Sequence, residues 1–176
     1  HIAELVSEQI KDGDSIMLDA SSTAVYVAKT LLEQGKKNLT VLPNSVEIII
    51  ELFGAQDWKV LSAGGESREG SFALVGYQTD RMLRSYHVDK AIISAKGIDM
   101  NAGLTDSDDL HANNKRTMLT RAKDKILAVD SSKFDQVAFA EIGSLDQITT
   151  IVTDAKPETR WLQHFDKIGV KCIYPK

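Results

Sequence analysis

The sequence has very little cysteine, since Cys172 is the only one among 176 residues. A single thiol excludes an intramolecular disulfide and a cysteine metal cluster, and it suits a reducing compartment such as the cytoplasm, where we expect the protein to act. Long hydrophobic runs are also missing, because no apolar stretch approaches the roughly 20 residues of a membrane-spanning helix. We therefore expect neither a disulfide scaffold nor a membrane partner.

Basic residues are not in excess. The 21 Lys and Arg residues are outnumbered by 25 Asp and Glu, which gives a formal net charge of −4 and a pI near 5.6. Domains that bind nucleic acid usually carry a basic patch and a high pI. The composition therefore predicts that this chain does not itself bind DNA.

The remaining composition is that of an ordinary globular protein, with 43% hydrophobic and 26% charged residues. The length suits one domain with a sizeable core, so we expect residues 1–176 to form a single domain. The chain starts at His1 within a helical pattern that places Ile2, Leu5 and Val6 on one face, with no capping residue before it. This start predicts that another segment precedes the chain.

Short β-rich runs alternate with helical periodicity along the sequence. The expected strands are residues 15–18, 39–42, 58–61, 90–94, 125–129, 150–153 and 171–174. The expected helices are residues 23–34, 46–53, 76–86, 108–122 and 158–168, with a helical turn at 145–148. This order is typical of an α/β fold with a mostly parallel sheet and helices on both faces. The polar stretch 97–109 is expected to be a long functional loop.

Polar clusters follow five of the expected strands. Ligands of parallel sheets bind outside the carboxyl ends of the strands, so these clusters are expected to converge on one crevice. The clusters are residues 19–23, 44–45, 64–66, 94–99 and 130–133.

The first cluster, residues 19–23, leads from a strand into a helix. Hydroxyls and unpaired amides at a helix N-terminus form an anion site, because the amides and the helix dipole both favour phosphate. The alternative is that Ser22 only caps the helix. A Walker loop is excluded, because its Gly-Lys pair and flanking glycines are missing.

Two further clusters each have a functional and a structural interpretation. Gly64 and Gly65 would let the backbone approach a ligand while Glu66 accepts sugar hydroxyls, or the segment is a plain tight turn. Lys96 would pair with a phosphate, and Asp99 would accept hydroxyls or move a proton. The alternative for this pair is a surface salt bridge.

The last cluster, residues 130–133, suits anion and hydroxyl binding, or is a polar turn anchored by Phe134.

His111 and Lys115 lie four residues apart and share one face of the expected helix. No further ligands for zinc have suitable spacing, so we expect a solvated helix face, no metal and no cofactor. Nucleophilic catalysis has no motif either, since Cys172 lacks a nearby base and no serine lies in a nucleophile elbow.

In order along the chain, these segments resemble the C-terminal sensor domain of the DeoR family of transcription regulators. The matching segments are residues 12–14, 18–23, 39–41, 44–45, 64–66, 75–76, 89–91, 97–99, 103–105, 115–116, 130–134 and 138–139. The resemblance covers nearly the whole chain, and the ordered set is more specific than any single motif. The family usually has glycine where this chain has Ser21, and glutamate where it has His111.

The resemblance implies a ribose-phosphate-isomerase-like fold, shared with CoA transferases, and an N-terminal winged helix-turn-helix domain that is absent from this chain. It also implies that the effector is a phosphorylated intermediate of a sugar pathway. In isomerase relatives a glutamate in the region of position 111 transfers protons, and a histidine could do so near neutral pH.

We therefore expect the effector-binding domain of a repressor of sugar metabolism, without enzymatic activity, that forms a homo-oligomer and contacts DNA only through the absent domain. An aldose–ketose isomerase on the same fold is the alternative, with Asp99 or Glu66 as its base, whereas no motif supports a CoA-transferase-like enzyme. The phosphate would be held by the hydroxyls of residues 21–23 and by Lys96, Lys115 and Lys133. The sugar hydroxyls would donate to the carboxylates of Asp19, Glu66 and Asp99. The expected ligand-binding residues are Asp19, Ser21, Ser22, Thr23, Asn44, Ser45, Gly64, Gly65, Glu66, Lys96, Gly97, Asp99, Lys115, Asp130, Ser132 and Lys133.

Overall fold

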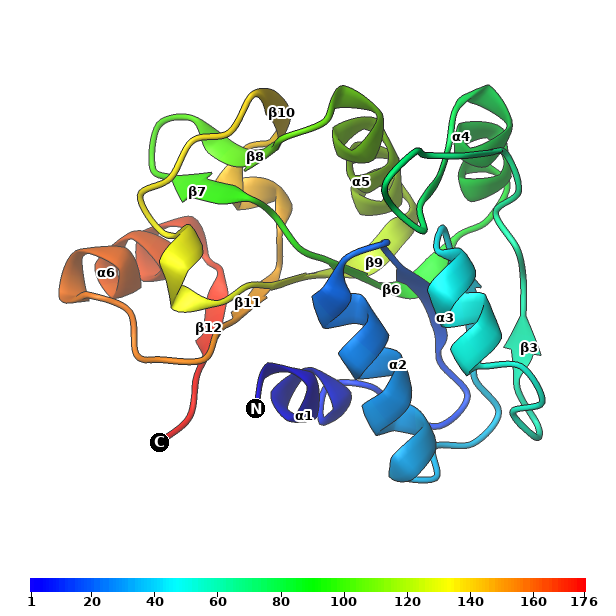
Figure 1. Ribbon diagram of the computed structural model, residues 1–176. Coiled ribbons are helices and arrows are strands. Elements are labelled where there is room, and N and C mark those ends of the chain that lie inside the picture. Colours follow the sequence, from blue (N-terminus) through cyan, green and yellow to red (C-terminus); the bar gives the residue numbers. More distant parts are fainter.

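Seven parallel strands form the central sheet of the computed structural model, which describes residues 1–176 (Figure 1). In spatial order they are β12 (Lys171–Ile173), β11 (Thr150–Val152), β9 (Ala122–Ala128), β6 (Val88–Ile93), β1 (Ser15–Leu18), β2 (Thr40–Pro43) and β3 (Lys59–Val60). Every neighbouring pair is parallel. The α/β fold expected from the sequence is confirmed, and each expected strand is present within three residues of its predicted bounds.

Helices cover both faces of this sheet and divide the core into two halves. α1 (Ile2–Ser7), α2 (Ser22–Glu33) and α3 (Val46–Glu51) pack on one face, and α4 (Tyr77–Arg84), α5 (Asp109–Arg121) and α6 (Thr159–Ile168) pack on the other. Successive strand residues alternate between the halves, because their side chains point to opposite faces. Met17 of β1 joins the half under α5 and α6, whereas Ile16 and Leu18 join the half under α2.

A second, antiparallel sheet lies on the same side of the main sheet as α5. Its strands are β10 (Ala140–Gly143), β8 (Gly103–Asp106) and β7 (Gly97–Asp99), in that order. The expectation of a long polar loop over 97–109 is therefore wrong for residues 97–106, which form a hairpin whose Ile98 and Leu104 are fully buried. Its polar residues make the turn, because Asp99 Oδ1 accepts hydrogen bonds from the amides of Asn101 and Ala102, both at 2.8 Å.

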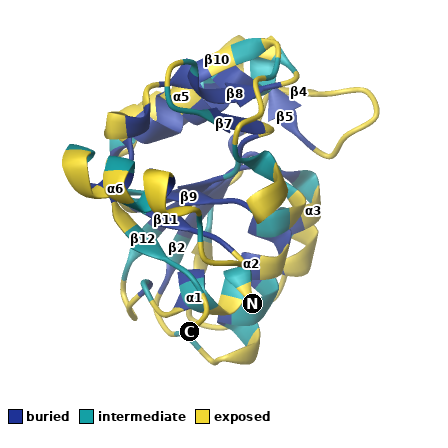
Figure 2. Ribbon diagram, turned by 90° about the vertical axis from the view of Figure 1, so that its left-hand side faces the viewer, coloured by how far each residue is buried: buried dark blue, intermediate teal, exposed yellow.

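Another hairpin that the sequence does not predict joins β4 (Glu66–Ser67) to β5 (Leu74–Val75). The loop between these strands is exposed and extends from the body of the molecule (Figure 2). Its base is fixed to the end of β2, since the Leu74 amide donates to the Asn44 carbonyl at 2.8 Å. At Gly65, φ is +102° and an added Cβ would lie 2.0 Å from Thr79 Oγ1, so a glycine is required by this turn.

Two short 3₁₀ turns complete the elements. η1 (Ser131–Lys133) follows β9, and η2 (Leu145–Gln147) matches the helical turn expected at 145–148. None of the helices is both long enough and apolar enough to cross a lipid bilayer.

Truncation of the buried hairpin tests its contribution to the core. Leu104→Ala removes a fully buried side chain, and we expect the free energy of unfolding to fall by about 2–5 kcal/mol, because the surroundings only partly fill the cavity. Val137→Ala, at a position that is 62% exposed, is the control and should change stability by less than about 0.5 kcal/mol. Urea unfolding measures both, and a small loss for Leu104→Ala would contradict a packed hairpin.

Candidate functional site

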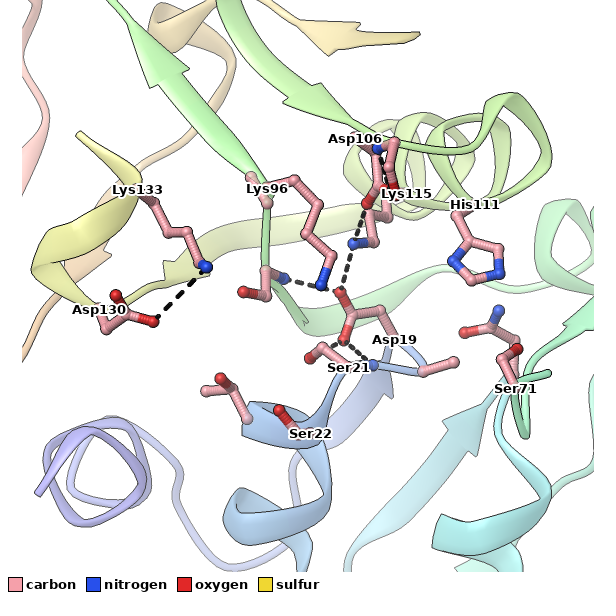
Figure 3. Close-up of a pocket in the computed structure, with 16 residues that line it drawn as sticks. Asp19, Ser21, Ser22, Ser71, Lys96, Asp106, His111, Lys115, Asp130 and Lys133 are labelled. Atoms are coloured by element: carbon pink, nitrogen blue, oxygen red, sulfur yellow. Dashed lines mark hydrogen bonds and ion pairs between the residues drawn. The ribbon is translucent and has the colours of Figure 1, made fainter. Parts of the chain in front are cut away.

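A cavity of about 380 Å³ lies at the carboxyl ends of β1, β2, β6 and β9, at the edge of the sheet where the sequence predicts a ligand crevice (Figure 3). Its size suits a small molecule, and only two of its sixteen lining residues are hydrophobic. The lining residues are Asp19, Ala20, Ser21, Ser22, Thr23, Asn44, Ser71, Ser94, Ala95, Lys96, Asp106, Ser107, His111, Lys115, Asp130 and Lys133. The cavity is therefore built to receive a polar ligand.

A buried ammonium group between two carboxylates lies at the centre of the site. Lys115 Nζ on α5 is 2.6 Å from Asp106 Oδ2 at the end of β8 and 3.4 Å from Asp19 Oδ2 after β1. Burial by itself would lower the pKa of Lys115, but the charges of Asp19 and Asp106 outweigh burial and raise that pKa above its usual value of 10.5. Lys115 is only 7% exposed, so it is a fixed cation that is already paired, not a free charge for a ligand.

Asp19 joins the ends of two neighbouring strands. Its Oδ2 accepts a hydrogen bond from the Ser94 amide after β6, at 2.7 Å. Its Oδ1 accepts from the amide of Ser21 at 3.0 Å and from the Ser21 hydroxyl at 2.5 Å. Asp19 thereby fixes the loop that leads into α2, and it has no unpaired oxygen left for a ligand.

The N-terminus of α2 is capped so that its first amides stay unpaired. Ser21 Oγ accepts from the Ala24 amide at 3.1 Å, so Ser21 is the cap, and the alternative that assigned this role to Ser22 is wrong. The amides of Ser22 and Thr23 donate to no acceptor in the protein, and both residues line the cavity. Unpaired amides at the positive end of a helix dipole form an anion site.

Three lysines line the cavity, and two of them are already paired. Lys115 and Lys133 lie near carboxylates, whereas Lys96 is exposed and unpaired. Lys133 Nζ lies 4.0 Å from Asp130 Oδ2. Burial would raise the pKa of Asp130, but hydrogen bonds from the Ser132 hydroxyl and amide and the charge of Lys133 outweigh it and lower the pKa. Lys96, whose side chain points into the cavity in Figure 3, is therefore the lysine of the cavity that has no carboxylate partner.

The far end of the cavity holds two buried polar atoms without partners. Figure 3 shows His111 and Ser71 at one end of the site, with Lys133 and Asp130 at the other. His111 Nε2 and Asn44 Oδ1 are buried and form no hydrogen bond within the protein. The expectation of a solvated helix face is wrong for Lys115, which is buried, whereas His111 is partly exposed and lines the cavity. No group of three or more His, Cys, Asp or Glu side chains is placed to hold a metal ion.

The structure brings together nine of the sixteen residues that the sequence predicts to bind the ligand. These nine are Asp19, Ser21, Ser22, Thr23, Asn44, Lys96, Lys115, Asp130 and Lys133. The other seven do not line the cavity, and the neighbours of each show its structural role.

Four of these seven belong to the end of β2 and the β4–β5 hairpin. Ser45 is buried and caps α3 by accepting from the Ile48 amide at 3.3 Å. Gly64 and Gly65 form the turn against Thr79, whose hydroxyl donates to the Gly64 carbonyl at 2.6 Å. Glu66 is exposed in β4. The plain turn is thus the interpretation that the geometry favours for this segment.

The remaining three lie around the β7–β8 hairpin and η1. A Cβ at Gly97 would lie 2.3 Å from the Gln136 carbonyl oxygen, so Gly97 allows close packing of two chain segments. Asp99 closes the hairpin turn, where hydrogen bonds from the amides of Ala102 and Asn101 lower its pKa. The Ser132 amide and hydroxyl both donate to Asp130 Oδ1.

Seven further lining residues are not among the expected ligand-binding residues, although Ala20, Ser94 and Ala95 belong to the expected clusters 19–23 and 94–99. The seven are Ala20, Ser71, Ser94, Ala95, Asp106, Ser107 and His111. Ser94 and Ala95 follow β6 directly, so the strand-end rule points to them. Asp106 and Ser107 end β8, and the same rule applies once the hairpin is recognised. Ser71 comes from the β4–β5 loop, and no local sequence signal indicates it.

Removal of the buried ammonium tests its structural role. Lys115→Met leaves Asp19 and Asp106 buried without their cation, and we expect a loss of about 3–5 kcal/mol in the free energy of unfolding at pH 7. Because folding raises the pKa of Lys115, its contribution is present below pH 10.5 and is lost only as the pH rises through the folded pKa. Urea unfolding from pH 7 to 11 measures the difference between the two proteins. A difference that disappears already near pH 8 would contradict the paired ammonium.

The sequence matches the family model described as the DeoR C terminal sensor domain over residues 1–155. It is 39% identical over 154 residues to the uncharacterized HTH-type transcriptional regulator YulB of Bacillus subtilis. This match covers 88% of this chain and 58% of that regulator. It is 30% identical over 162 residues to the glycerol-3-phosphate regulon repressor of Escherichia coli. This match covers 92% of this chain and 64% of the repressor. The chain thus spans about three fifths of the length of these two curated relatives.

The fold is similar to that of ribose 5-phosphate isomerase A from Methanocaldococcus jannaschii. The TM-score is 0.54, and the match covers 76% of this chain and 52% of the isomerase at 19% identity. At that identity the likeness shows the fold alone, whereas the family match extends over most of the sequence and the ordered strand-end motifs. The chain therefore belongs to the DeoR family of transcription regulators and corresponds to its C-terminal sensor domain.

Proposed function

We propose that this chain senses a phosphorylated sugar for a DeoR-type repressor of sugar metabolism, and that the ligand occupies the cavity at the strand ends. The observation that carries the proposal is the anion site at α2, where the unpaired amides of Ser22 and Thr23 lie in the same cavity as the unpaired Lys96. A phosphate dianion there would gain charge-assisted hydrogen bonds, each contributing about 1.5–3 kcal/mol. The name of one relative, the glycerol-3-phosphate regulon repressor, agrees with an effector of this class.

The polar groups of the cavity favour binding over catalysis. An isomerase needs a free carboxylate beside the substrate carbon, and the two candidates from the sequence, Glu66 and Asp99, lie outside the cavity. Asp19 and Asp106 line it, but both are engaged by Lys115 and by backbone amides. The chain would therefore hold the sugar phosphate without converting it.

DNA binding by the complete regulator would reside outside this chain. The relatives are HTH-type regulators or repressors by name, and this chain spans only part of their length. Its net charge of −4 does not suit a DNA-binding surface. We also infer that it self-associates, because regulators that read paired half-sites share the two-fold symmetry of their operators.

Calorimetry with matched pairs of sugars and sugar phosphates tests the ligand class. We expect a pentose or hexose phosphate to bind at least about tenfold more tightly than the same sugar without phosphate. Lys96→Ala should weaken binding of the sugar phosphate by about 10- to 100-fold and leave the free sugar unchanged, because one charge-assisted contact is lost. Lys167→Ala, which removes an exposed cation on α6, and Asp99→Ala, outside the cavity, are the controls. Equal affinity for sugar and sugar phosphate in the unaltered protein would refute the proposal.

An isomerase assay separates the sensor from the enzyme on the same fold. We expect no interconversion of aldose and ketose phosphates when the protein is incubated with pentose and hexose phosphates at substrate excess. The physical reason is that each carboxylate lining the cavity is paired with a lysine, so none is free to move a proton, and His111 is the one candidate base that remains. Turnover that persists after repurification and is abolished by His111→Leu or by Asp106→Asn would instead support the enzyme.

A further inference from the structure

The end of the cavity that is remote from Lys133 carries the strongest unexplained feature of the molecule. His111 Nε2 and Asn44 Oδ1 are both buried, and neither has a hydrogen-bond partner in the protein. Nearly all buried polar atoms in native proteins are paired, and each exception needs an explanation. Asn114 Oδ1 is a third buried atom without a partner, but Asn114 does not line the cavity. His111 and Asn44 do line it, so their missing partners would come from what the cavity holds.

The backbone at both positions and the Asn44 side chain are held in place, whereas no hydrogen bond within the protein holds the His111 ring. Asn44 Nδ2 donates to the Leu74 carbonyl at 3.1 Å. This bond fixes the orientation of the amide, whose Oδ1 remains available as a hydrogen-bond acceptor. The His111 amide donates to Asp108 Oδ1 at 3.1 Å, within the cap of α5. Arg68 Nη2 from the β4–β5 loop pairs with the other oxygen of Asp108 at 2.5 Å, so the loop and the start of α5 are joined. The backbone at the far end of the cavity is therefore held in place, and the His111 ring is free to turn toward a ligand.

We propose that His111 and Asn44 select the sugar by hydrogen-bonding hydroxyls of the ligand that lie beyond its phosphate. This inference rests on the proposed function and deepens it, because it assigns the phosphate to the α2 end and the hydroxyls to the His111 end. A hydroxyl both donates and accepts, so it can donate to Asn44 Oδ1 and can either donate to or accept from the imidazole. Inorganic phosphate has the anion but not the hydroxyl-bearing carbon chain, and it would leave these two atoms unpaired.

The same geometry predicts an unusual stability effect. No hydrogen bond within the protein holds the His111 ring, so an apolar group of similar size at this position breaks none. His111→Leu should therefore leave the unliganded protein as stable as the unaltered one or make it more stable, while ligand selection is lost. A histidine with a purely structural role would show the opposite effect on stability.

The experiment compares inorganic phosphate with four phosphate esters, namely glycerol 3-phosphate, ribose 5-phosphate, fructose 6-phosphate and glucose 6-phosphate. Calorimetry gives the ratio of the dissociation constant for inorganic phosphate to that for each ester. In the unaltered protein we expect this ratio to reach about ten or more for at least one ester. In His111→Leu the ratio should fall to about three or less with the affinity for inorganic phosphate unchanged, and His111→Gln, which keeps a donor and an acceptor, should retain part of it.

Two control variants separate this role from the others. Lys96→Ala should weaken inorganic phosphate and the ester equally and so preserve the ratio, because it acts at the phosphate end. His87→Leu, which removes an exposed histidine outside the cavity, should change neither affinity. Thermal unfolding without ligand supplies the second readout for His111→Leu.

The outcomes distinguish the inference from the function on which it rests. A ratio that survives in His111→Leu would overturn the inference and leave a phosphorylated ligand in place. A lower unfolding temperature of His111→Leu, with loss of inorganic phosphate binding as well, would assign the histidine a structural role and also overturn it. If neither phosphate nor any ester binds the unaltered protein, the proposed function itself fails.

Discussion

The site depends on one buried contact, the ammonium of Lys115 between the carboxylates of Asp19 and Asp106. These three residues come from α5, the end of β1 and the end of β8, so the contact joins the helix to both sheets. The cost of desolvating buried charges offsets much of their attraction, so such a group contributes little net stability compared with an apolar core. Its effect is geometric, because Asp19 can hold Ser21 and the start of α2 only while its own charge is balanced.

This balance also decides which groups can attract an anion. The single cation at the centre is shared between two carboxylates, and Lys133 lies near Asp130. The groups that remain free to bind an anion are therefore the Lys96 ammonium and the unpaired amides of Ser22 and Thr23 at the start of α2. The sequence, which shows two lysines after strand ends and a third in a helix, predicts a more strongly cationic pocket than the structure has. Their pairing is a property of tertiary structure, and no spacing along the chain reveals it.

The predictability of the fold follows from the strength of each local pattern. The long helices and the buried strands repeat hydrophobic residues with clear periods, so the α/β order could be predicted, as could the convergence of four of the five strand-end clusters. The fifth cluster, residues 64–66, lies outside the cavity. The β7 and β8 strands have three and four residues each and are flanked by glycine and polar turn residues, which is also the composition of a loop. Gly64 and Gly65 were ambiguous for the same reason, since a glycine pair serves a turn or a ligand equally well. His111 was not expected at the site because the part of the cavity that it lines is completed by Ser71 of the β4–β5 loop, which is distant in the sequence.

The cavity lies at the edge of the sheet and is lined by both the start of α2 and α5, which bears on how a sensor of this kind could respond. A sensor responds only when its ligand binds one arrangement of the protein better than another. A phosphate ion at the start of α2 contacts groups near one end of the cavity, and inorganic phosphate is present in every cell. A sugar phosphate that also contacts His111 would touch α2 and α5, which pack on opposite faces of the sheet. Its binding would then depend on the relative position of these two helices, so the sugar, more than the phosphate, would supply the free-energy difference on which a response depends.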